Sequence, residues 1–151
     1  MKFSDFKSLL KTVTGYPFDP ATSLVSIDCN DLASNEGIHI CGFELNTGIV
    51  GFKQNAYIDK LDAETAANGV NIVVDSRSNE PGHLTVEQLL DCIDNLVRVS
   101  GSGDLQVAVL DAPTSRYGAP LEITKIYSRI EVDTSGEAVC TAHIQLAEED
   151  F

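Results

Sequence analysis

Two stretches of the chain repeat apolar residues every three or four positions, which is the spacing of one face of an α-helix. The first covers residues 3–14 and is followed by Gly15 and Pro17, which end helices. The second begins in HLTVEQLLDCIDNL, where Thr85 can cap the helix and Gln88 completes a capping box three residues later. It ends at the SGSG of residues 100–103. Both stretches predict amphipathic helices.

Elsewhere apolar and polar residues alternate, as in strands with one buried and one solvated face. Strands are expected at residues 24–29, 38–45, 49–53, 70–74, 105–110, 121–132 and 138–146. A turn at residues 46–48 is expected to join the second and third strands in a hairpin. Asp62 before AETAAN, with Gly69 after it, predicts a short helix. A change of apolar phase near Thr124 predicts a bulge.

These elements predict an α+β fold, with antiparallel sheets and the two main helices packed on one face. The 151 residues fit a single compact domain, and the alternative is a subdivision into 1–75 and 84–151 joined by the loop 76–83. Each half reads as a helix, a strand that ends in an acid (Asp28, Asp111) and a hairpin. This order suggests two α-β-β-β units, although chance explains it about as well, because a helix followed by antiparallel strands is common.

Charge bears on the class of partner. Asp and Glu number 23 against 10 Lys and Arg, which gives a formal net charge of -13. This charge repels nucleic-acid phosphates and anionic membranes, so we expect no direct binding to either. It would attract the basic surface of another protein, such as a nucleic-acid channel, with an affinity that falls as salt rises. Solubility is the more ordinary explanation of an acidic composition.

The cysteines and histidines lack the spacing of a zinc site. The four cysteines contain no CxxC pair: Cys29, Cys41, Cys92 and Cys140. Because Cys41 and Cys140 lie in apolar alternations and Cys92 lies in a helix, we expect buried free thiols in a reducing compartment. The opening MKFSDFKSLLKTV has no apolar run of the kind found in signal peptides or membrane anchors. A cytoplasmic protein without a metal or other cofactor is therefore expected.

Residues 84–146 combine LTVEQLLDCIDNL, DLQVAVLDA, the loop with RYG at 116–118, EITKIYSRIEVD and a last alternating strand. In this order they resemble a type of small bacterial and phage α+β protein. Proteins of that type begin with a Thr-Val-capped helix, continue through a strand bearing an Asp and end with a two-stranded return. The resemblance implies a compact module of phage or mobile-element origin, at work in a bacterial or phage-infected cell. It brings no catalytic residues, and it leaves the first half of the chain unmatched.

No stretch of the sequence predicts a catalytic site. Phosphate-binding and dinucleotide-binding glycine motifs are absent, and no Ser or Cys lies in a known nucleophile motif. Three histidines are scattered along the chain, as surface or structural histidines usually are: His39, His83 and His143. Asp28, Asp31 and Glu36 lie close together but lack the spacing of a calcium loop, so capping of strand ends explains them. An enzyme with an unfamiliar site remains an alternative.

The strongest candidates for a partner-binding surface are three carboxylates on the polar face of the second helix, Glu87, Asp91 and Asp94. Arg116 and Tyr117 are added because Arg and Tyr are common at binding hot spots and their loop is flanked by prolines. We therefore predict a small acidic, non-enzymatic binding protein, an inhibitor, immunity or phage anti-defence type that occupies a partner's basic surface as a nucleic-acid mimic. The alternative is a scaffold protein that forms a homo-oligomer through a strand edge or the Phe-rich N-terminal helix.

Overall fold

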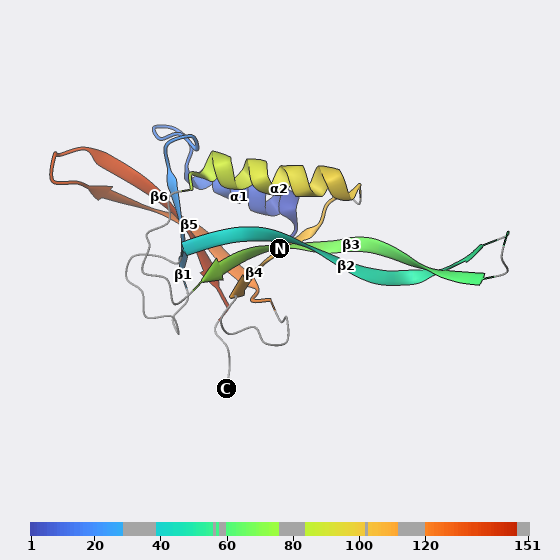
Figure 1. The fold of residues 1–151 in the computed structure, drawn as a ribbon. Helices are drawn as coiled ribbons and strands as arrows, with labels where there is room; N and C mark the ends of the chain where they lie inside the picture. The colour runs from blue at the N-terminus through green and yellow to red at the C-terminus, as the bar shows by residue number, and fades with distance from the viewer. Residues whose placement is uncertain are drawn as a thin grey trace.

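The computed structural model describes residues 1–28, 39–55, 57, 60–75, 84–101, 103–111 and 120–147. The elements in chain order are α1 (Phe3–Val13), β1 (Leu24–Asp28), β2 (His39–Asn55), β3 (Lys60–Asp75), α2 (Val86–Ser100), β4 (Gln106–Asp111), β5 (Ile123–Val132) and β6 (Ala138–Leu146). Figure 1 shows both helices on one side of the strands, with the β2–β3 hairpin projecting far to the right. The fold is therefore α+β, as predicted.

The start of α2 follows from its first residues. Thr85 Oγ1 accepts a hydrogen bond from the Gln88 amide at 3.2 Å, and Gln88 Oε1 accepts one from the Thr85 amide at 3.0 Å. Two backbone N–H groups that lack partners within the helix are thereby satisfied. Gly101 ends the helix in the left-handed conformation, with φ of 64°. The predicted cap and stop of this helix are both confirmed.

The start of α1 is capped by a residue distant in the sequence. Lys2 occupies the N-cap position and its side chain makes no capping hydrogen bond. Instead the Asp104 carboxylate, in the loop after α2, accepts hydrogen bonds from the Ser4 amide at 2.9 Å and from Ser4 Oγ at 2.6 Å. Because hydrogen bonds to the ionised form favour it, those from Ser4 lower the pKa of Asp104.

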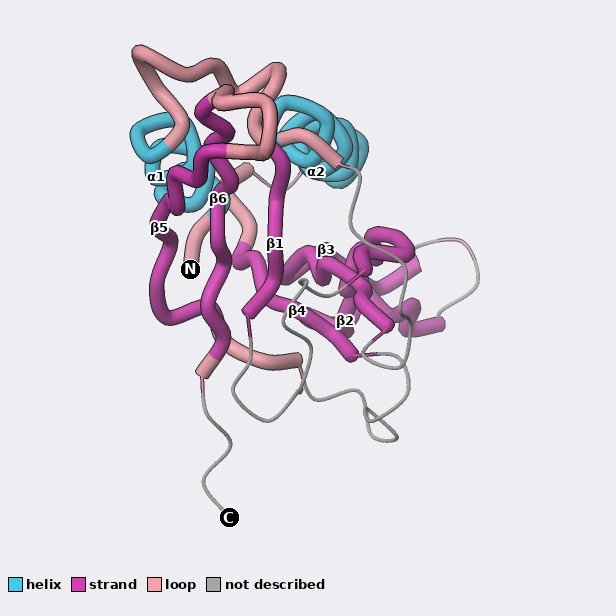
Figure 2. The backbone as a smooth tube through the Cα atoms, turned by 90° about the vertical axis from the view of Figure 1, so that its left-hand side faces the viewer, coloured by secondary structure: helices cyan, strands magenta, loops and turns pink. Residues whose placement is uncertain are grey.

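The strands form two mixed sheets, with the orders β1-β6-β5 and β2-β3-β4. The β5–β6 and β2–β3 pairs are antiparallel, but β1 runs parallel to β6 and β3 runs parallel to β4. The prediction of antiparallel sheets was therefore wrong for two of the four pairings. Alternation along a strand indicates that one face is buried, but it does not identify the neighbouring strand. The sequence pattern therefore could not distinguish parallel from antiparallel pairing. Figure 2 shows the strands of the two sheets running in different directions.

The β2–β3 hairpin overturns two local predictions. The expected turn at residues 46–48 and the expected helix at AETAAN both lie inside continuous strands. Paired residues run from His39 opposite Asp75 to Asn55 opposite Lys60, with register shifts near Asn46 and Ile49. Turn and helix preferences of a few residues amount to about 1 kcal/mol, and a long ladder of backbone hydrogen bonds outweighs them. The irregularities that suggested a turn and a helix occur near these bulges.

The remaining strands lie close to their predicted positions. β1, β4 and β6 agree with prediction to within one residue at each end, and β5 begins two residues later than expected. The register of β5 against β6 shifts between Ile123 and Lys125, which confirms the bulge predicted near Thr124.

One hydrophobic core joins both helices and both sheets. Its fully buried side chains include Phe6 and Leu10 from α1, Leu89 and Ile93 from α2, and Ile27, Ile72, Val109 and Ile144 from the strands. Phe3 and Phe6 lie in this core, with 5% and 0% of their surface exposed. The expectation that a Phe-rich face of the N-terminal helix is available for self-association was therefore wrong. No helix among the described residues has the length and apolar character needed to cross a membrane.

Candidate functional site

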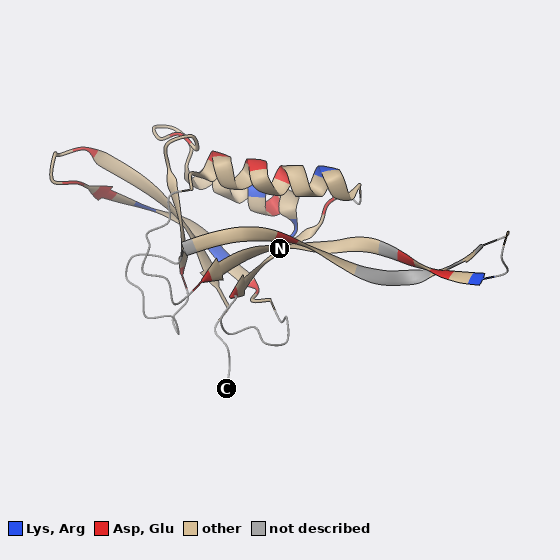
Figure 3. Cartoon of the chain, in the orientation of Figure 1, with Lys and Arg blue, Asp and Glu red and all other residues tan. Residues whose placement is uncertain are grey.

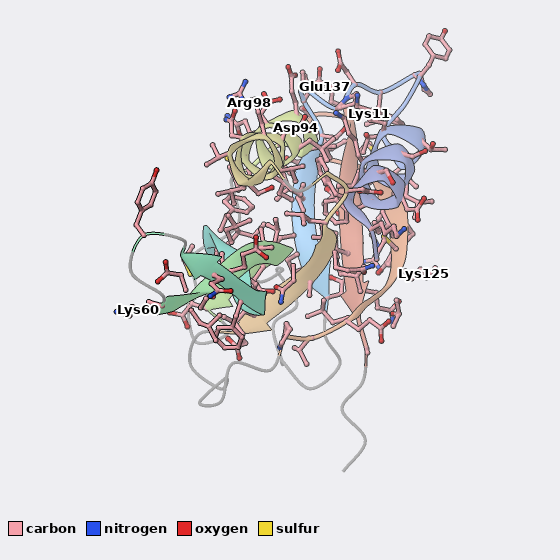
Figure 4. All side chains as sticks on the ribbon, turned by 90° about the vertical axis from the view of Figure 1, so that its right-hand side faces the viewer. Lys11, Lys60, Asp94, Arg98, Lys125 and Glu137 are labelled. Atoms are coloured by element: carbon pink, nitrogen blue, oxygen red, sulfur yellow. The ribbon has the colours of Figure 1, made fainter. Side chains whose placement is uncertain are left out.

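The three carboxylates predicted on the second helix lie together beside α1. Glu87, Asp91 and Asp94 follow one another at steps of three and four residues along α2 and line a cavity of about 340 Å³. The complete lining is Lys7, Lys11, Asp19, Pro20, Glu87, Leu90, Asp91 and Asp94. The lining therefore contains four carboxylates and two ammonium groups. Figure 4 shows Asp94 on α2 and Lys11 on α1 at the same end of the molecule.

A salt bridge lies within this cavity wall. Lys7 Nζ is 3.0 Å from Asp94 Oδ2, and the two side chains are 35% and 44% exposed. A pair this exposed contributes only about 0 to 1 kcal/mol to stability. It does neutralise one of the three predicted carboxylates, so Glu87 and Asp91 carry most of the negative charge that a ligand would meet.

A second, wider hollow continues from the same salt bridge. Its volume is about 590 Å³, and Lys7 and Asp94 line both cavities. The lining also includes Phe3, Ser4, Val97, Arg98, Gly101, Gly103 and Asp104. We call the two cavities together the helix groove. Its first part has more carboxylates than lysines, and its second part has mostly apolar walls that also include Arg98 and Asp104.

Carboxylates outside the helix groove are numerous as well. Figure 3 shows acidic residues on α2, on the outer half of β3 and on the β5–β6 hairpin. Exposed examples on the two hairpins are Asp62, Glu64, Glu131, Asp133 and Glu137. The helix groove therefore holds only a share of the negative charge, and it differs from the other acidic regions because its carboxylates surround a cavity.

Arg116 and Tyr117, the other predicted binding residues, lie outside the described residues, as do Asp31, Glu36, His83 and the loop 76–83.

The cysteine prediction is partly wrong. Cys140 is buried and Cys92 is half-buried, but Cys41 is exposed, with its thiol 3.4 Å from the Val73 carbonyl oxygen. Cys41 lies on β2, at the edge of its sheet. A side chain with apolar neighbours in such a strand can still lie on the face that is exposed to solvent.

A polar cluster that the sequence did not predict joins three strands. Asp28 Oδ2 accepts a hydrogen bond from Tyr127 Oη at 2.6 Å and lies 2.9 Å from His143 Nδ1. The Tyr127 and His143 rings stack, with centroids 5.0 Å apart, and Lys125 Nζ lies 5.0 Å from the Tyr127 ring centre. The hydrogen bond to Asp28, then burial and the negative charge of Asp28, raise the pKa of Tyr127.

The parallel pairing of β1 with β6 creates this cluster. Ser26 lies beside His143 and Asp28 beside Gln145, so Asp28 and His143 project from the sheet face opposite the buried Ile27 and Ile144. The residues are 115 positions apart in the chain. The sequence did carry two signals, an acid at the end of one strand and a histidine on the polar side of another. Without the strand pairing, nothing connected them.

The chemistry available to the cluster is limited to the groups that surround it. An aspartate that holds a histidine in one orientation is part of many hydrolytic sites, but such sites also need a nucleophile within hydrogen-bond reach. Among the described residues, no hydroxyl or thiol is hydrogen-bonded to His143, and no three metal-binding side chains converge anywhere. The observed contacts tie β1 to the β5–β6 hairpin, which is a structural role.

Comparison of the chain with models of known protein families, with curated proteins and with solved structures gave no match. The resemblance of residues 84–146 to small bacterial and phage proteins stays a prediction.

Proposed function

We propose that this chain is a small acidic binding protein whose helix groove receives a basic segment of a partner protein. The observation that carries the proposal is the arrangement of Asp19, Glu87, Asp91 and Asp94 around a cavity of about 340 Å³ between the two helices. The lining carries four carboxylates against the ammonium groups of Lys7 and Lys11, so a Lys or Arg side chain entering this cavity would meet a net negative charge. Its alkyl stem could lie against Leu90 and Pro20. Complementary charge of this kind speeds association and selects the partner.

An inhibitor or immunity-type protein fits this description, including one encoded by a phage to block a host defence protein. The basic segment would then belong to a surface that normally handles nucleic acid, and the carboxylates would take the place of phosphates. The formal net charge of -13 supports this class of partner over nucleic acid itself. The proposed role is binding without catalysis, because the groove offers a partner negative charge and a complementary shape.

A peptide-binding measurement tests the groove. The probes are a synthetic Lys- and Arg-rich peptide and a neutral peptide of the same length, titrated into the chain by calorimetry at about 0.1 M salt. The basic peptide is expected to bind and the neutral peptide is not. The variant Glu87→Gln/Asp91→Asn is expected to weaken binding of the basic peptide by about three- to tenfold, because two exposed ion pairs contribute about 1 kcal/mol or less each.

The matched control is Glu131→Gln/Glu137→Gln, which removes the same charge from the β5–β6 hairpin. It should change the affinity by less than about twofold, since charges further away than about 10 Å are screened. Equal loss in both variants would show that the peptide responds to net charge and would contradict a specific groove. Absence of binding by the unaltered chain would contradict it too.

We propose further that the two α-β-β-β runs descend from one duplicated unit. Support comes from the matching pairings, in which β1 joins β6 in parallel and β4 joins β3 in parallel. Each run thus contributes its first strand to the other run's sheet. The duplication would account for the recurrence of a strand that ends in an acid, at Asp28 and at Asp111.

A further inference from the structure

The residues that line the two parts of the helix groove form one continuous stripe on each helix. On α2 they recur at steps of three and four residues from Glu87 to Gly101, and on α1 they run in the same way from Phe3 to Lys11. Residues at these steps share one face of a helix. At a rise of about 1.5 Å per residue, the stripe on α2 is about 21 Å long. The helix groove is therefore a linear channel, with the length of about six extended residues.

The salt bridge between Lys7 and Asp94 divides this channel. Lys7 Nζ lies 3.0 Å from Asp94 Oδ2 and 5.8 Å from the centre of the Phe3 ring, so two contacts hold the ammonium group in place. Lys7 and Asp94 line both cavities, which puts the salt bridge where the two parts of the groove meet. A segment that lies along the channel would therefore place one side chain in each part, on either side of the salt bridge.

The two parts differ in charge. The first part has four carboxylates and two ammonium groups, a net charge of -2. In the second part the carboxylates of Asp94 and Asp104 are balanced by the cations of Lys7 and Arg98. The Asp104 carboxylate also accepts two hydrogen bonds from Ser4. The first part therefore favours a cationic side chain, whereas the second part offers a cation no net attraction.

The second part of the groove is suited to an apolar side chain. Val97 lines it and is only half-buried, and the residues at its far end, Gly101 and Gly103, have no side chains. Both glycines have positive φ, 64° and 78°, and Gly101 ends α2 in this conformation. A Cβ atom at either glycine would meet no atom within 4 Å. The residues that stop the helix thus also keep this end of the groove open.

The spacing of the two parts gives the spacing of the two side chains. On α2 the first part is centred near Leu90 and the second near Val97, and these positions are about 10 Å apart along the helix. An extended chain covers about 10 Å in three residues. A helical segment would need seven residues, and it would dock through an apolar stripe that the first part, bordered by carboxylates and lysines, does not offer. An extended segment is therefore the better fit.

We propose that the helix groove recognises a basic residue and an apolar residue three positions apart in an extended segment of the partner protein. The basic side chain enters the first part and the apolar side chain enters the second. This inference rests on the proposed function, because it adds a second determinant to the same groove. Charge alone would accept any basic segment, whereas a requirement for both side chains restricts binding to segments that carry the two at this spacing.

Heteronuclear NMR titration at about 0.1 M salt tests the inference with short peptides that have neutral ends. The cores are Lys-Ser-Ser-Leu (the Leu peptide), Lys-Ser-Ser-Ser (the Ser peptide) and Lys-Leu-Ser-Ser (the close peptide), each flanked by Gly and Ser. The Leu peptide is also made in the reverse order, and the tighter of the two orders is the reference. It should bind about fivefold more tightly than the Ser peptide, because partial burial of a leucine side chain contributes about this much. The close peptide should bind at least about twofold less tightly than the reference, since its two side chains are too near each other to enter both parts.

Two matched valine variants locate the apolar contact. Val97→Thr replaces a methyl group in the second part by a hydroxyl group, and it should reduce the advantage of the Leu peptide over the Ser peptide to about twofold. Val99→Thr makes the same change on the same helix at a side chain that is 77% exposed and outside the groove lining, and it should preserve the fivefold advantage. Far-UV circular dichroism checks that both variants have folded.

The charge determinant and the apolar determinant should respond independently. Glu87→Gln/Asp91→Asn should weaken the Leu and Ser peptides by the same factor and leave their ratio unchanged, because it alters only the first part. Raising the salt concentration from about 0.1 M to about 0.3 M should likewise weaken both peptides and preserve the ratio, since salt screens the ion pairs and not the apolar contact.

Methyl resonances of the unaltered chain provide a measurement without substitutions. The Leu peptide should shift the resonances of Val97 and not those of Val99, whereas the Ser peptide should shift neither. Both peptides should shift the backbone amide resonances of Glu87 and Asp91. A Leu peptide that leaves Val97 unchanged would overturn the inference even if a variant had failed to fold.

The remaining outcomes separate this inference from the proposed function. Equal affinity of the Leu and Ser peptides would overturn the inference and leave the proposed function in place, as would failure of both to bind while the Lys- and Arg-rich peptide binds. Failure of the Lys- and Arg-rich peptide as well would overturn both. A Leu advantage that stays fivefold in Val97→Thr, or tighter binding of a peptide with Lys and Leu seven positions apart, would overturn the inference by assigning another site or a helical segment.

Discussion

At the scale of single residues, Asp28 shows how a side chain can acquire a role that its local sequence does not indicate. By its position it is an acid at the end of a strand, and such acids usually cap the strand. In the fold it accepts a hydrogen bond from Tyr127 and lies within hydrogen-bond distance of His143, on two other strands. The cluster therefore ties the first strand of the chain to its last hairpin.

Loss of the Tyr127 hydroxyl tests this link. Tyr127→Phe is expected to lower the free energy of unfolding by about 1 kcal/mol at neutral pH, because a hydrogen bond to a partly exposed carboxylate is lost. The raised pKa of Tyr127 means that the unfolded chain loses the phenolic proton first as pH increases. The hydrogen bond therefore stabilises the fold fully below about pH 10, and the contribution is lost above it.

Urea denaturation of both proteins between about pH 7 and about pH 11 measures this difference. The difference in free energy of unfolding between the two proteins should be constant up to about pH 9 and should decrease above about pH 10. Other tyrosines and lysines titrate in both proteins and cancel in the comparison. A difference that increases at high pH would mean that Asp28 does not accept its hydrogen bond from the protonated Tyr127 hydroxyl.

At the scale of elements, α2 and the β2–β3 hairpin represent opposite cases. The limits of α2 follow from Thr85, Gln88 and Gly101, whose side chains or backbone conformation act on their immediate neighbours. The limits of β2 and β3 follow from their mutual pairing over almost their whole length. For that reason local reasoning placed the helix correctly and placed a turn and a short helix inside two continuous strands.

The capping box of α2 gives a prediction at this scale. Thr85→Ala removes the hydroxyl that accepts from the Gln88 amide and should lower the free energy of unfolding by about 1 kcal/mol. Thr85→Ser keeps the hydroxyl and should cost less than about half of that. Thermal unfolding followed by circular dichroism checks both variants. Equal effects of Ala and Ser would show that the threonine methyl group, and not its hydroxyl, matters at this position.

At the scale of the whole molecule, the exchange of first strands joins the two halves. β1 from the first half pairs with β6 from the second, and β4 from the second pairs with β3 from the first. The core combines side chains of both helices and both sheets. Stability should therefore belong to the complete chain, because either half alone would leave a strand unpaired and a large apolar face exposed to water.

Separate expression of residues 1–80 and 81–151 tests this dependence. Each fragment alone is expected to show no cooperative unfolding transition, and an equimolar mixture should regain helix and strand signals in far-UV circular dichroism. Mixing restores the pairings of β1 with β6 and of β3 with β4, which neither fragment can make alone. A fragment that unfolds cooperatively by itself would instead identify an independent subdomain, as in the alternative division at the loop 76–83.

The sequence by itself determined the α+β class, both helices with the cap and stop of α2, the β5 bulge and the carboxylates on one face of α2. Each of these depends on interactions within a few residues, where side-chain spacing and capping act directly. Only the tertiary structure decided which strands are neighbours, that two pairings are parallel, and that Asp28 meets His143. These features join residues as much as 117 positions apart, and their energies arise from long-range pairing and shared burial, which no local pattern records.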